Sequence, residues 1–562
     1  MDDFLLIASL VIGALIVLII IGIITSKLAT KSLYTRLKNK YGTINDTSYE
    51  YDEFEAISHY FKNTVNESDY YVDDITWNDL DMDSIYILIN SCSSSVGREY
   101  LYKLLRTPVN KSDILSERER LINYLDSHED ERTKIMMALK KMGFTRKLSI
   151  SDYLKNVFSL KPESNIFHYF VNALLIASLL YMILVDAVFG ILMLLVSSGI
   201  AITTYYKQKS KIETYFICIK QLVAMLDAGK DIAELNINEL SEYNELFSKL
   251  NKKFAKVSRN SFLLVSSKEN NGSLVEIVME YVRMFSHVDL IKFNSMLKHM
   301  SGNYDDVISL FDNLGLIDSM ISVGNFRRII PYYCTPVFTD TANIDISEVY
   351  HLCIKKPVPN SIVENGPVLI TGSNASGKST FLKSVAILAI LAQSINTCPA
   401  KKYLAQYYRV YSSMALRDSI ESGESYYIVE IKSLKRIMDK ANEAGDRILC
   451  FVDEVLRGTN TIERIAASSQ ILKELEAKSV LCFAATHDIE LTYILKDYYS
   501  NYHFTEQVVD NEIVFSYELM KGRATSRNAI KLLEIIGYNK EIVEKAQNRA
   551  KDFANTGVWR QI

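Results

Sequence analysis

The distribution of apolar and polar residues divides the chain into three kinds of region. Two stretches, 4–24 and 166–205, are almost free of charged residues over lengths that suit membrane-spanning helices. Residues 43–159 and 209–326 carry apolar side chains at the spacing of amphipathic helices. From about residue 331 onward, short apolar runs alternate with turns and helical patterns. The pattern therefore predicts a mixed fold, with helical regions first and an α/β domain last.

The first apolar stretch is predicted to be a membrane anchor, because it matches the ~20 residues that a helix needs to cross a bilayer. A secretory signal peptide is the alternative, but Asp2 and Asp3 stand where such a peptide carries basic residues. We therefore expect residues 1–26 to form an uncleaved transmembrane helix. Several basic residues follow before any acid, which places the N-terminus outside and the next segment in the cytoplasm. They are Lys27, Lys31, Arg36, Lys38 and Lys40.

The second apolar stretch is too long for one crossing and is interrupted at Asp186. It is predicted to form a transmembrane hairpin over residues 163–206, with helices at Ile166–Leu184 and Val188–Tyr205 and Asp186 at the outer turn. Basic residues flank both ends, so both are expected in the cytoplasm. A buried helical pair within a soluble domain is the alternative. Together with the anchor, the hairpin predicts a multi-pass cell-membrane protein with three transmembrane helices.

The two amphipathic regions predict helical domains. Within residues 43–160, the clearest helices are predicted at Ser84–Leu105 and Ile114–Leu125, with Pro108 in the break between them. Residues 207–330 contain long amphipathic stretches without proline. Such a pattern is typical of lever helices or of a packing scaffold.

The sequence from Val368 to Leu382 reads VLITGSNASGKSTFL, an apolar strand, a Gly-rich turn and the start of a helix. It contains G-x-x-x-x-G-K-[ST], a spacing in which backbone N–H groups surround phosphate oxygens at the positive end of a helix. Lys378 is expected to reach the β- and γ-phosphates of ATP, and Ser379 to bind Mg²⁺. The residues predicted to bind the nucleotide are Gly372, Ser373, Asn374, Ala375, Ser376, Gly377, Lys378, Ser379 and Thr380. A Gly/Ser-rich loop without a ligand is the alternative, which the flanking strand and helix disfavour.

Two further apolar runs are expected to bring acids and a histidine to the same site. Residues 447–453, RILCFVD, predict a buried parallel strand that ends in Asp453 and Glu454. Asp453 is expected to hold Mg²⁺, and Glu454 to polarise the attacking water as general base. A third run, 480–485, precedes His487, which is predicted to hydrogen-bond the γ-phosphate. The sequence thus predicts a Mg²⁺-dependent ATPase with the catalytic residues Lys378, Glu454 and His487.

Composition adds two limits. The net charge is −4, so any contact with nucleic acid must come from local basic patches. The seven cysteines form no C-x-x-C pair, and several lie inside apolar runs. They are typical of reduced core residues in a cytosolic environment rather than of a zinc site or a disulfide framework.

Five segments near the end of the chain resemble, in order, the motifs of MutS-family ATPases. They are TGSNASGKSTFLKSVAILAILAQSINTCPA (Thr371–Ala400), ESGESYYIVEI (Glu421–Ile431), FVDEVLRGTNT (Phe451–Thr461), AATHDIELT (Ala484–Thr492) and KGRATSRNAIKLLEIIGYNKEIVEKAQ (Lys521–Gln547). The resemblance implies that residues 331–562 form an ABC-type P-loop ATPase domain with a C-terminal helix-turn-helix. More weakly, Leu80–Val109 is similar to the family's helical core domain, whose pattern Gly97, Leu101 and Pro108 fit.

The resemblance also implies a partner subunit. In such ATPases the signature segment of one subunit completes the site of the other, so Ser422, Gly423 and Ser425 would donate to the partner's γ-phosphate. This predicts a homodimer through the ATPase domain, in which ATP joins the subunits and hydrolysis moves the helical levers. Ala529–Gly537 and Lys540–Phe553 would clasp the partner, with a self-packed hairpin as the alternative.

Three features depart from the family pattern. Only the anchor and a short stretch precede the core-like segment, so we expect no mismatch-reading domain. Phe504, Thr505 and Glu506 match the family's mismatch-inserting Phe-x-Glu by letters, but they are expected to be strand and turn. In the signature, Tyr426 stands where the family carries threonine.

Two functions fit these features. The first is a membrane-anchored ATPase that binds DNA or branched nucleic acid, as the resemblance implies. The second is a mechanical or signalling switch in the membrane without a DNA role, which the hairpin motivates. A transporter is disfavoured because the hairpin has few polar residues to line a pathway.

Gln393 is a candidate relay between nucleotide and helical region, or simply a polar residue at a helix end. The candidate phosphate contacts, which equally suit a solvated helix face, are Lys249, Lys252, Lys253 and Lys256.

Overall fold

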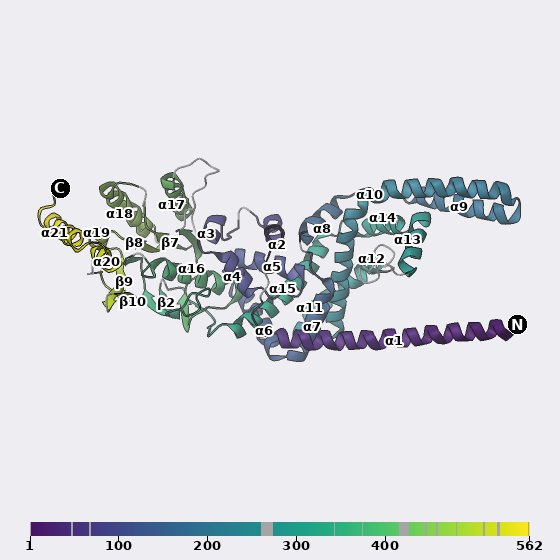
Figure 1. The fold of residues 1–562 in the computed structure, drawn as a ribbon, viewed down its shortest axis with the longest axis horizontal. Coiled ribbons are helices and arrows are strands. Elements are labelled where there is room, and N and C mark those ends of the chain that lie inside the picture. Colours follow the sequence, from purple (N-terminus) through teal and green to yellow (C-terminus); the bar gives the residue numbers. More distant parts are fainter. Residues whose placement is uncertain are drawn as a thin grey trace. The chain divides into compact units, whose positions relative to one another are not determined.

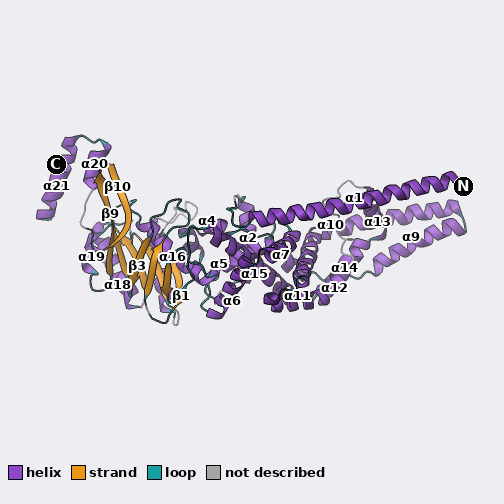
Figure 2. Cartoon of the chain, turned by 90° about the horizontal axis from the view of Figure 1, so that it is seen from below, coloured by secondary structure: helices purple, strands orange, loops and turns teal. Residues whose placement is uncertain are grey.

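The chain forms two compact units, each assembled from separate stretches of sequence (Figure 1). Unit 1 comprises Met1–Val65, Asn90–Lys103 and Arg120–Phe326, and unit 2 comprises Asn66–Ile89, Leu104–Glu119 and Arg327–Ile562. The computed structural model describes all residues except 1, 46–48, 67–68, 146, 260–273, 342, 374, 415–425, 444–446, 457–458, 479, 510–511, 525–528, 560 and 562. The predicted mixed fold, with helical regions and a C-terminal α/β part, is confirmed (Figure 2).

The regular secondary structure of unit 1 is all helical among its described residues. Its helices are α1 (Asp2–Lys40), α2 (Tyr51–Thr64), α5 (Ser95–Arg106), α6 (Ser112–Ser127), α7 (Glu129–Met142), α8 (Ile150–Ser159), α9 (Ile166–Leu184), α10 (Ala187–Glu234), the 3₁₀ turn η1 (Asn238–Leu240), α11 (Ser241–Lys253), α12 (Ala255–Ser258), α13 (Leu274–Ser286), α14 (Val288–Met300) and α15 (Tyr304–Ile329). The last residues of α5 and α15 and the first half of α6 belong to unit 2.

The apolar stretch 166–205 forms a helical hairpin in which α9 and α10 pack along each other. Asp186 caps α10 by accepting a hydrogen bond from Phe189 N at 2.7 Å. α10 continues for 48 residues to Glu234, so the predicted second span and the start of the predicted lever region are one helix. The predicted anchor falls within α1, where most side chains of the apolar run lie outside the description.

Four helices among the described residues are long and apolar enough to cross a membrane: α9, α10 as far as Glu213, α15 and α16 (Lys378–Ile395). α15 and α16 are mostly buried inside the protein, whereas the hairpin is mostly exposed. Burial explains the apolar character of α15 and α16 without a bilayer. The hairpin therefore remains the candidate membrane element in this set.

A buried polar contact joins α5 to α15. Asp318 of α15 accepts hydrogen bonds from Ser93 N (2.9 Å), Ser94 N (3.0 Å) and Ser94 Oγ (2.6 Å). The carboxylate thereby satisfies N–H groups at the start of α5, which have no partner within the helix. Burial raises the pKa of Asp318 to about 6. Gly97 lies one turn further along, where a Cβ would be 2.2 Å from Asp318 Oδ2.

This contact corrects the prediction of one helix over Ser84–Leu105. The structure has two helices, α4 (Met82–Ile89) and α5, with a break at residues 90–94. The amides of Ser93 and Ser94 bind Asp318 instead of a preceding helical turn. The helix predicted at Ile114–Leu125 is confirmed as α6.

Unit 2 contains a six-stranded and a four-stranded sheet. The six-stranded sheet has the order β10-β9-β4-β8-β7-β6; β9 and β10 are antiparallel, and the other neighbours are parallel. Its strands are β4 (Val368–Thr371), β6 (Arg409–Ser413), β7 (Ile448–Asp453), β8 (Leu481–Thr486), β9 (Ser500–Val509) and β10 (Glu512–Lys521). The smaller sheet has the order β1-β5-β2-β3, formed by β1 (Val337–Phe338), β2 (Ile344–Val349), β3 (Asn360–Glu364) and β5 (Lys402–Ala405).

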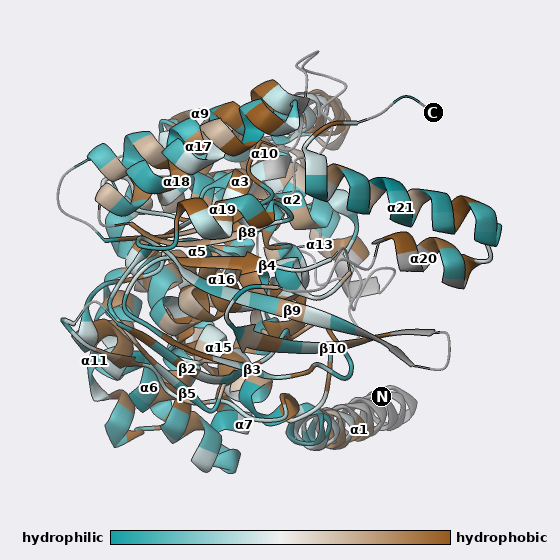
Figure 3. Ribbon diagram, turned by 90° about the vertical axis from the view of Figure 1, so that its left-hand side faces the viewer, coloured by the Kyte–Doolittle hydropathy of each residue, from teal (hydrophilic) through white to brown (hydrophobic). Residues whose placement is uncertain are grey.

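Helices cover the central strands of the larger sheet. β4 and β8 are buried along their whole length, as expected for parallel strands with both faces covered, and Figure 3 shows hydrophobic residues around them. The strands predicted at 447–453 and 480–485 are confirmed as β7 and β8. The helices of unit 2 are α3 (Asp74–Asp79), α4, α16, α17 (Tyr426–Asn442), α18 (Thr461–Ala477), α19 (Ile489–Ile494), α20 (Ala529–Ile536) and α21 (Lys540–Thr556).

Residues 66–89 join unit 2 because α3 binds the edge strand β6. Asp79 Oδ2 accepts hydrogen bonds from Ser412 Oγ (2.7 Å) and Met414 N (2.9 Å). Asp73, the N-cap of α3, pairs with Arg436 of α17 at 2.6 Å. α3 therefore holds both elements that flank residues 415–425.

Candidate functional site

The Gly-rich turn links the central strand β4 to the N-terminus of α16. Its backbone is left-handed at Gly372 (φ +154°), Ala375 (φ +63°) and Gly377 (φ +108°). A Cβ at Gly372 would lie 2.8 Å from Ser376 Oγ, so the turn requires glycine there. The first N–H groups of a helix have no intrahelical partner and carry partial positive charge. The turn and the helix end therefore form a site that can bind an anion.

Lys378 begins α16 and is only 5% exposed. Its Nζ donates hydrogen bonds to Gly372 O at 2.8 Å and Ser373 O at 2.9 Å. Ser373 Oγ in turn donates to Glu506 Oε2 of β9 at 2.7 Å, a contact that the sequence did not indicate. Ser376 Oγ is buried and has no hydrogen-bond partner among the described residues. A buried hydroxyl without a partner is costly, so this atom fits a bound acceptor such as a phosphate oxygen.

The pairing register of the sheet brings three strand ends to one edge. Thr371 of β4 lies opposite Thr486 of β8, and Asp453 of β7 lies opposite Ala485 of β8. Parallel strands run in the same direction, so the residues that follow them leave the sheet at the same edge. The Gly-rich turn, Glu454 and His487 are therefore neighbours, as the sequence predicts.

Glu454 and His487 contact each other directly, with 2.8 Å between Glu454 Oε1 and His487 Nε2. The backbone of Glu454 is left-handed (φ +58°), which is unusual for a residue with a side chain, and its N–H donates to Ala485 O at 2.9 Å. The sequence predicts a bond from His487 to the γ-phosphate. In the structure, Nε2 binds the glutamate carboxylate, and this contact fixes the orientation of the carboxylate.

Asp453 Oδ1 is buried and has no hydrogen-bond partner in the described part of the chain. Burial raises the pKa of Asp453, and a hydrogen bond with Ser379 opposes that shift. Carboxylate and hydroxyl oxygens are preferred ligands of Mg²⁺, so Asp453 and Ser379 fit that ion. No group of three or more His, Cys, Asp or Glu side chains that could hold a metal occurs among the described residues. An ion here would take its other ligands from water and phosphate.

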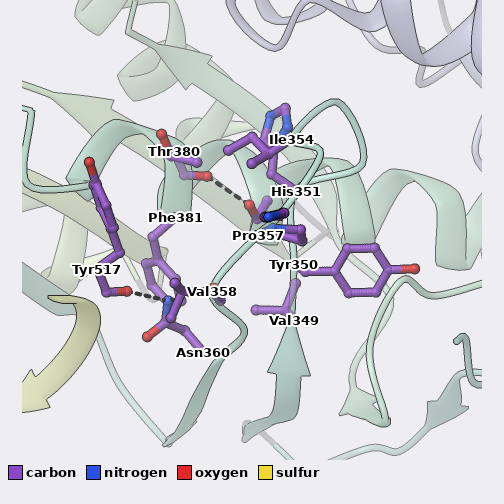
Figure 4. Close-up of a pocket in the computed structure, with 13 residues that line it drawn as sticks. Val349, Tyr350, His351, Ile354, Pro357, Val358, Asn360, Thr380, Phe381 and Tyr517 are labelled. Carbon is purple, nitrogen blue, oxygen red and sulfur yellow. Dashed lines mark hydrogen bonds between the residues drawn. The ribbon is translucent and has the colours of Figure 1, made fainter. Parts of the chain in front are cut away.

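A cavity of about 300 Å³ opens beside the turn (Figure 4). Asn360 Nδ2 donates to Tyr517 O at 3.0 Å, and Leu519 N donates to Asn360 Oδ1 at 2.7 Å, which ties β3 to β10 at its rim. Its apolar and aromatic lining suits a flat heterocyclic base. The lining residues are Val349, Tyr350, His351, Ile354, Lys356, Pro357, Val358, Asn360, Gly377, Thr380, Phe381, Ser384 and Tyr517.

Burial lowers the pKa of His351 in this wall, which favours the neutral form of its ring. Of the lining residues, the sequence predicted only Gly377 and Thr380 as binding residues. The others come from residues 349–360, 381–384 and 517, and no single spacing in the sequence joins these three stretches.

Four predicted site residues, Asn374, Ser422, Gly423 and Ser425, lie outside the described residues. The structure describes the elements on either side of residues 415–425, namely β6 and α17. The placement of the signature relative to the turn thus remains a prediction.

The candidate relay Gln393 is buried near the end of α16. Its Nε2 donates to Tyr408 O (2.8 Å), and Tyr408 N donates to Gln393 Oε1 (2.7 Å). The backbone oxygen of Gln393 accepts from Val109 N at 2.9 Å. Gln393 therefore ties α16 to the start of β6 and to residues 104–119, an arrangement that suits both a relay and a structural role.

Comparison with known proteins covers the same region. The family described as MutS domain V matches residues 368–554. The DNA mismatch repair protein MutS of Pseudothermotoga lettingae is 28% identical over 274 residues, which are 47% of this chain and 33% of that protein. MutS of Thermus thermophilus is 31% identical over 192 residues, 34% of this chain and 23% of that protein. MutS protein homolog 4 of Mus musculus is 29% identical over 332 residues, 54% of this chain and 33% of that protein.

These alignments span a third or less of the length of each relative. The family match over residues 368–554 includes the Gly-rich turn, the acids after β7 and the histidine after β8, which the fold brings to one edge of the sheet. Residues 368–554 are therefore a MutS domain V, and this is the part of the chain that the family match covers.

Proposed function

We propose that the protein is a membrane-anchored ATPase that binds and hydrolyses Mg²⁺–ATP in domain V and couples this cycle to its helical unit. The observation that carries the proposal is the meeting of three strand ends around the Gly-rich turn, where Lys378, Asp453, Glu454 and His487 lie together. Similarity to MutS proteins over the same residues supports it.

In this proposal the adenine of ATP occupies the cavity beside α16, and the phosphates lie on the Gly-rich turn. The backbone N–H groups of the turn and of the first turn of α16 hold the phosphate oxygens. Lys378 exchanges its bonds to the carbonyls of Gly372 and Ser373 for bonds to β- and γ-phosphate oxygens. Because Lys378 is buried, water screens this interaction only weakly.

Asp453 and Ser379 would hold Mg²⁺, which neutralises phosphate charge when bound. Glu454 orients the attacking water and accepts its proton. His487 keeps the Glu454 carboxylate in place through the 2.8 Å contact between Nε2 and Oε1. Lys378 stabilises the negative charge that develops on the transferred phosphoryl group.

A homodimer would complete the site with the signature residues Ser422, Gly423 and Ser425 of the partner. The C-terminal helices support a partner because apolar side chains on and beside α20 and α21 are exposed. Ile536, Tyr538, Ile542 and Trp559 are between 52% and 70% exposed. A second subunit that covered them would remove this apolar surface from water.

Membrane anchoring is supported by the exposed apolar side chains of the hairpin. Leu184 is 75% and Val188 is 82% exposed at its outer turn, and similar residues continue along both helices. Burying apolar surface is worth about 25 cal/mol per Å², so an exposed apolar hairpin favours lipid over water. The N-terminal end of α1 and the turn of the hairpin lie at the same end of unit 1 (Figures 1 and 2), as the predicted topology with both outside requires.

α13, which contacts both α9 and α10, adds to this support. Its apolar residues Ile277, Val278, Tyr281 and Val282 are exposed, whereas Arg283 on the opposite face is 7% exposed. A helix in water normally buries its apolar side and exposes its charges. The reversed arrangement of α13 suits contact with the lipid beside the hairpin.

We further propose contact with DNA or branched nucleic acid, because the relatives are named as DNA mismatch repair proteins and as a MutS homolog. Lys249, Lys252 and Lys256 are exposed at α11 and α12, while Lys253 forms an ion pair with Asp306. The second candidate, a membrane switch without a DNA role, is favoured by α10, which runs from the hairpin turn into the core of unit 1 as one helix.

The ATPase proposal is tested with the full-length chain in lipid nanodiscs. Lys378→Ala and Glu454→Gln should each abolish steady-state hydrolysis. The matched control is Lys402→Ala, a lysine of the same unit that pairs with Asp345 away from the turn. Undiminished turnover in either site variant would refute the site assignment.

The two candidate functions are separated by binding of the same full-length protein to duplex and four-way-junction DNA over a salt series. DNA contact predicts binding that weakens as salt rises and weakens further when Lys249, Lys252 and Lys256 are changed to Gln. If the protein binds no DNA at low salt, the membrane switch without a DNA role is the remaining candidate. Protease protection of tagged termini in sealed membranes should show Met1 outside and Ile562 inside, and an inside Met1 would exclude the topology.

A further inference from the structure

Two cysteines of unit 2 face each other across an isolated antiparallel bridge. Cys334 N donates to Cys398 O at 3.0 Å, and Cys398 N donates to Cys334 O at 2.9 Å. Residues that exchange both backbone hydrogen bonds have Cα atoms about 5.5 Å apart, inside the range of about 4.4–6.8 Å found across disulfides. The backbone already holds these residues at a distance that a disulfide can span.

The two thiols hydrogen-bond each other, and this contact lowers the pKa of Cys334 below its usual value. Burial raises the pKa of Cys398, which is 0% exposed, whereas Cys334 is partly exposed. Only the thiolate is a strong nucleophile. The pair thus combines an accessible thiol that ionises more easily with an enclosed thiol that stays protonated.

Neighbouring hydrogen bonds hold both segments in place. Tyr350 Oη donates to Tyr332 O at 2.8 Å, two residues before the accessible cysteine. Arg327 Nε donates to Thr397 Oγ1 at 2.9 Å, immediately before the enclosed cysteine. These contacts keep the thiols together without a ligand.

We propose that Cys334 and Cys398 are an oxidation site that forms a reversible disulfide on exposure to hydrogen peroxide. The Cys334 thiolate attacks one peroxide oxygen, which breaks the O–O bond, forms a sulfenic acid and releases hydroxide. The Cys398 sulfur then attacks the Cys334 sulfur, the S–S bond forms, and the hydroxyl leaves with the thiol proton as water. Two thiols and one peroxide become one disulfide and two waters, and a dithiol reductant reverses the change by exchange.

The disulfide would close a covalent ring that includes the Gly-rich turn of the candidate nucleotide site. The residues between the two cysteines include β4, the Gly-rich turn and the whole of α16. Such a ring restricts the unfolded chain and limits how far the segment around Cys334 can separate from the residues that follow α16. The proposal rests on the geometry of the pair and does not depend on ATP hydrolysis.

The chain contains a matched comparison. Cys450 and Cys482 lie opposite each other on β7 and β8, and their thiols are also hydrogen-bonded. Both are 0% exposed. Peroxide reacts with thiols that it can reach, so this pair should stay reduced in the folded protein. Cys353, which is exposed, shows whether exposure alone is sufficient for oxidation.

The test is a peroxide titration of the full-length protein, purified under reductant and then freed of it. Peroxide is removed, the protein is denatured in excess N-ethylmaleimide so that buried thiols are blocked as they become accessible, and cross-linked peptides are identified by mass spectrometry. We expect a Cys334–Cys398 cross-link, the loss of two thiols per chain and a higher thermal midpoint, all reversed by dithiothreitol. Cys450 and Cys482 should remain thiols at the same dose.

Single variants separate the two roles. In Cys334→Ser, Cys398 should stay reduced at the dose that oxidises the wild type; in Cys398→Ser, Cys334 should accumulate sulfenic and sulfinic acid. The main measurement, the cross-link between Cys334 and Cys398, is made on the wild-type protein. A variant that fails to fold therefore does not weaken the test. Three outcomes overturn the proposal: sulfinic acid at Cys334 without a cross-link in the wild type, a cross-link that forms only after denaturation, or equal oxidation of Cys450 and Cys482.

Discussion

Replacing Gly97 by alanine tests how the helical unit is held together. Gly97 lies in the first turn of α5, and a Cβ there would be 2.2 Å from Oδ2, 2.6 Å from Cγ and 2.7 Å from Cβ of Asp318. Non-bonded atoms do not approach so closely, so one side must move. Asp318 is held by hydrogen bonds from Ser93 N, Ser94 N and Ser94 Oγ, so moving its carboxylate breaks at least one of them.

The cost can be worked from these contacts. In an unobstructed helix, glycine to alanine stabilises by about 1 kcal/mol. Here overpacking costs about 1–3 kcal/mol, and one lost hydrogen bond to a charged acceptor costs about 1.5–3 kcal/mol. The balance is a destabilisation of about 1.5–5 kcal/mol for Gly97→Ala. At Gly199 of α10, an added Cβ would meet no heavy atom within 4 Å, so Gly199→Ala should be neutral or slightly stabilising.

Thermal unfolding of the full-length protein in one detergent measures both changes. Asp318→Gly removes every side-chain atom that the new Cβ would meet, so Gly97→Ala should cost less in that background than alone. Equal midpoints for Gly97→Ala and wild type would refute the reasoning. An unchanged cost in the Asp318→Gly background would show that the destabilisation has another source.

Four further changes test the site and its supports. Glu454→Gln removes the general base, which is worth about 10²–10⁴-fold in rate, so steady-state hydrolysis should be lost while ATP is still retained; filter binding of labelled nucleotide measures the retention, and its loss would show a structural role instead. Mg²⁺ affinity should fall as the pH drops through the raised pKa of Asp453, because the proton and the cation compete for the same carboxylate, and Asp453→Asn should remove this dependence. Asp79→Ala removes the buried acceptor of Ser412 Oγ and should lower stability by about 2–5 kcal/mol in denaturant unfolding. Burial raises the pKa of Glu99 from 4.5 to about 8, so the unfolded chain releases this proton at lower pH than the folded one; stability should fall as pH rises between those values, and Glu99→Gln should flatten the profile.

The site residues that the sequence predicted correctly as neighbours share a simple physical origin. Each follows an apolar run, and each run is short enough to be a buried strand, as for Glu454 after β7 and His487 after β8. Parallel strands share one direction, so their ends meet at one edge whatever their order. The order itself, with β4 between β8 and β9, leaves no local mark in the sequence.

Contacts between residues that are far apart in the sequence could not be predicted from local patterns. Asp318 breaks the helix predicted at Ser84–Leu105 from 225 positions away along the chain. Asp79 binds Ser412 across 333 positions, and this bond assigns α3 to unit 2. Helical spacing indicates which face of a helix is buried, but it does not indicate which polar group of another segment packs against that face. The same holds for Glu506, whose bond to Ser373 crosses 133 positions.

Two helical segments of unit 2 bind elements of domain V that lie next to the predicted signature and the Gly-rich turn. α3 binds the end of β6 through Asp79, directly before residues 415–425, which contain the predicted signature. Glu119 accepts from Asn396 Nδ2 at 2.9 Å just beyond α16, the helix whose first residue is Lys378. These two segments are joined in sequence by residues 90–103 of unit 1. The proposed coupling of the ATPase cycle to the helical unit would therefore run along continuous chain, through residues 90–103.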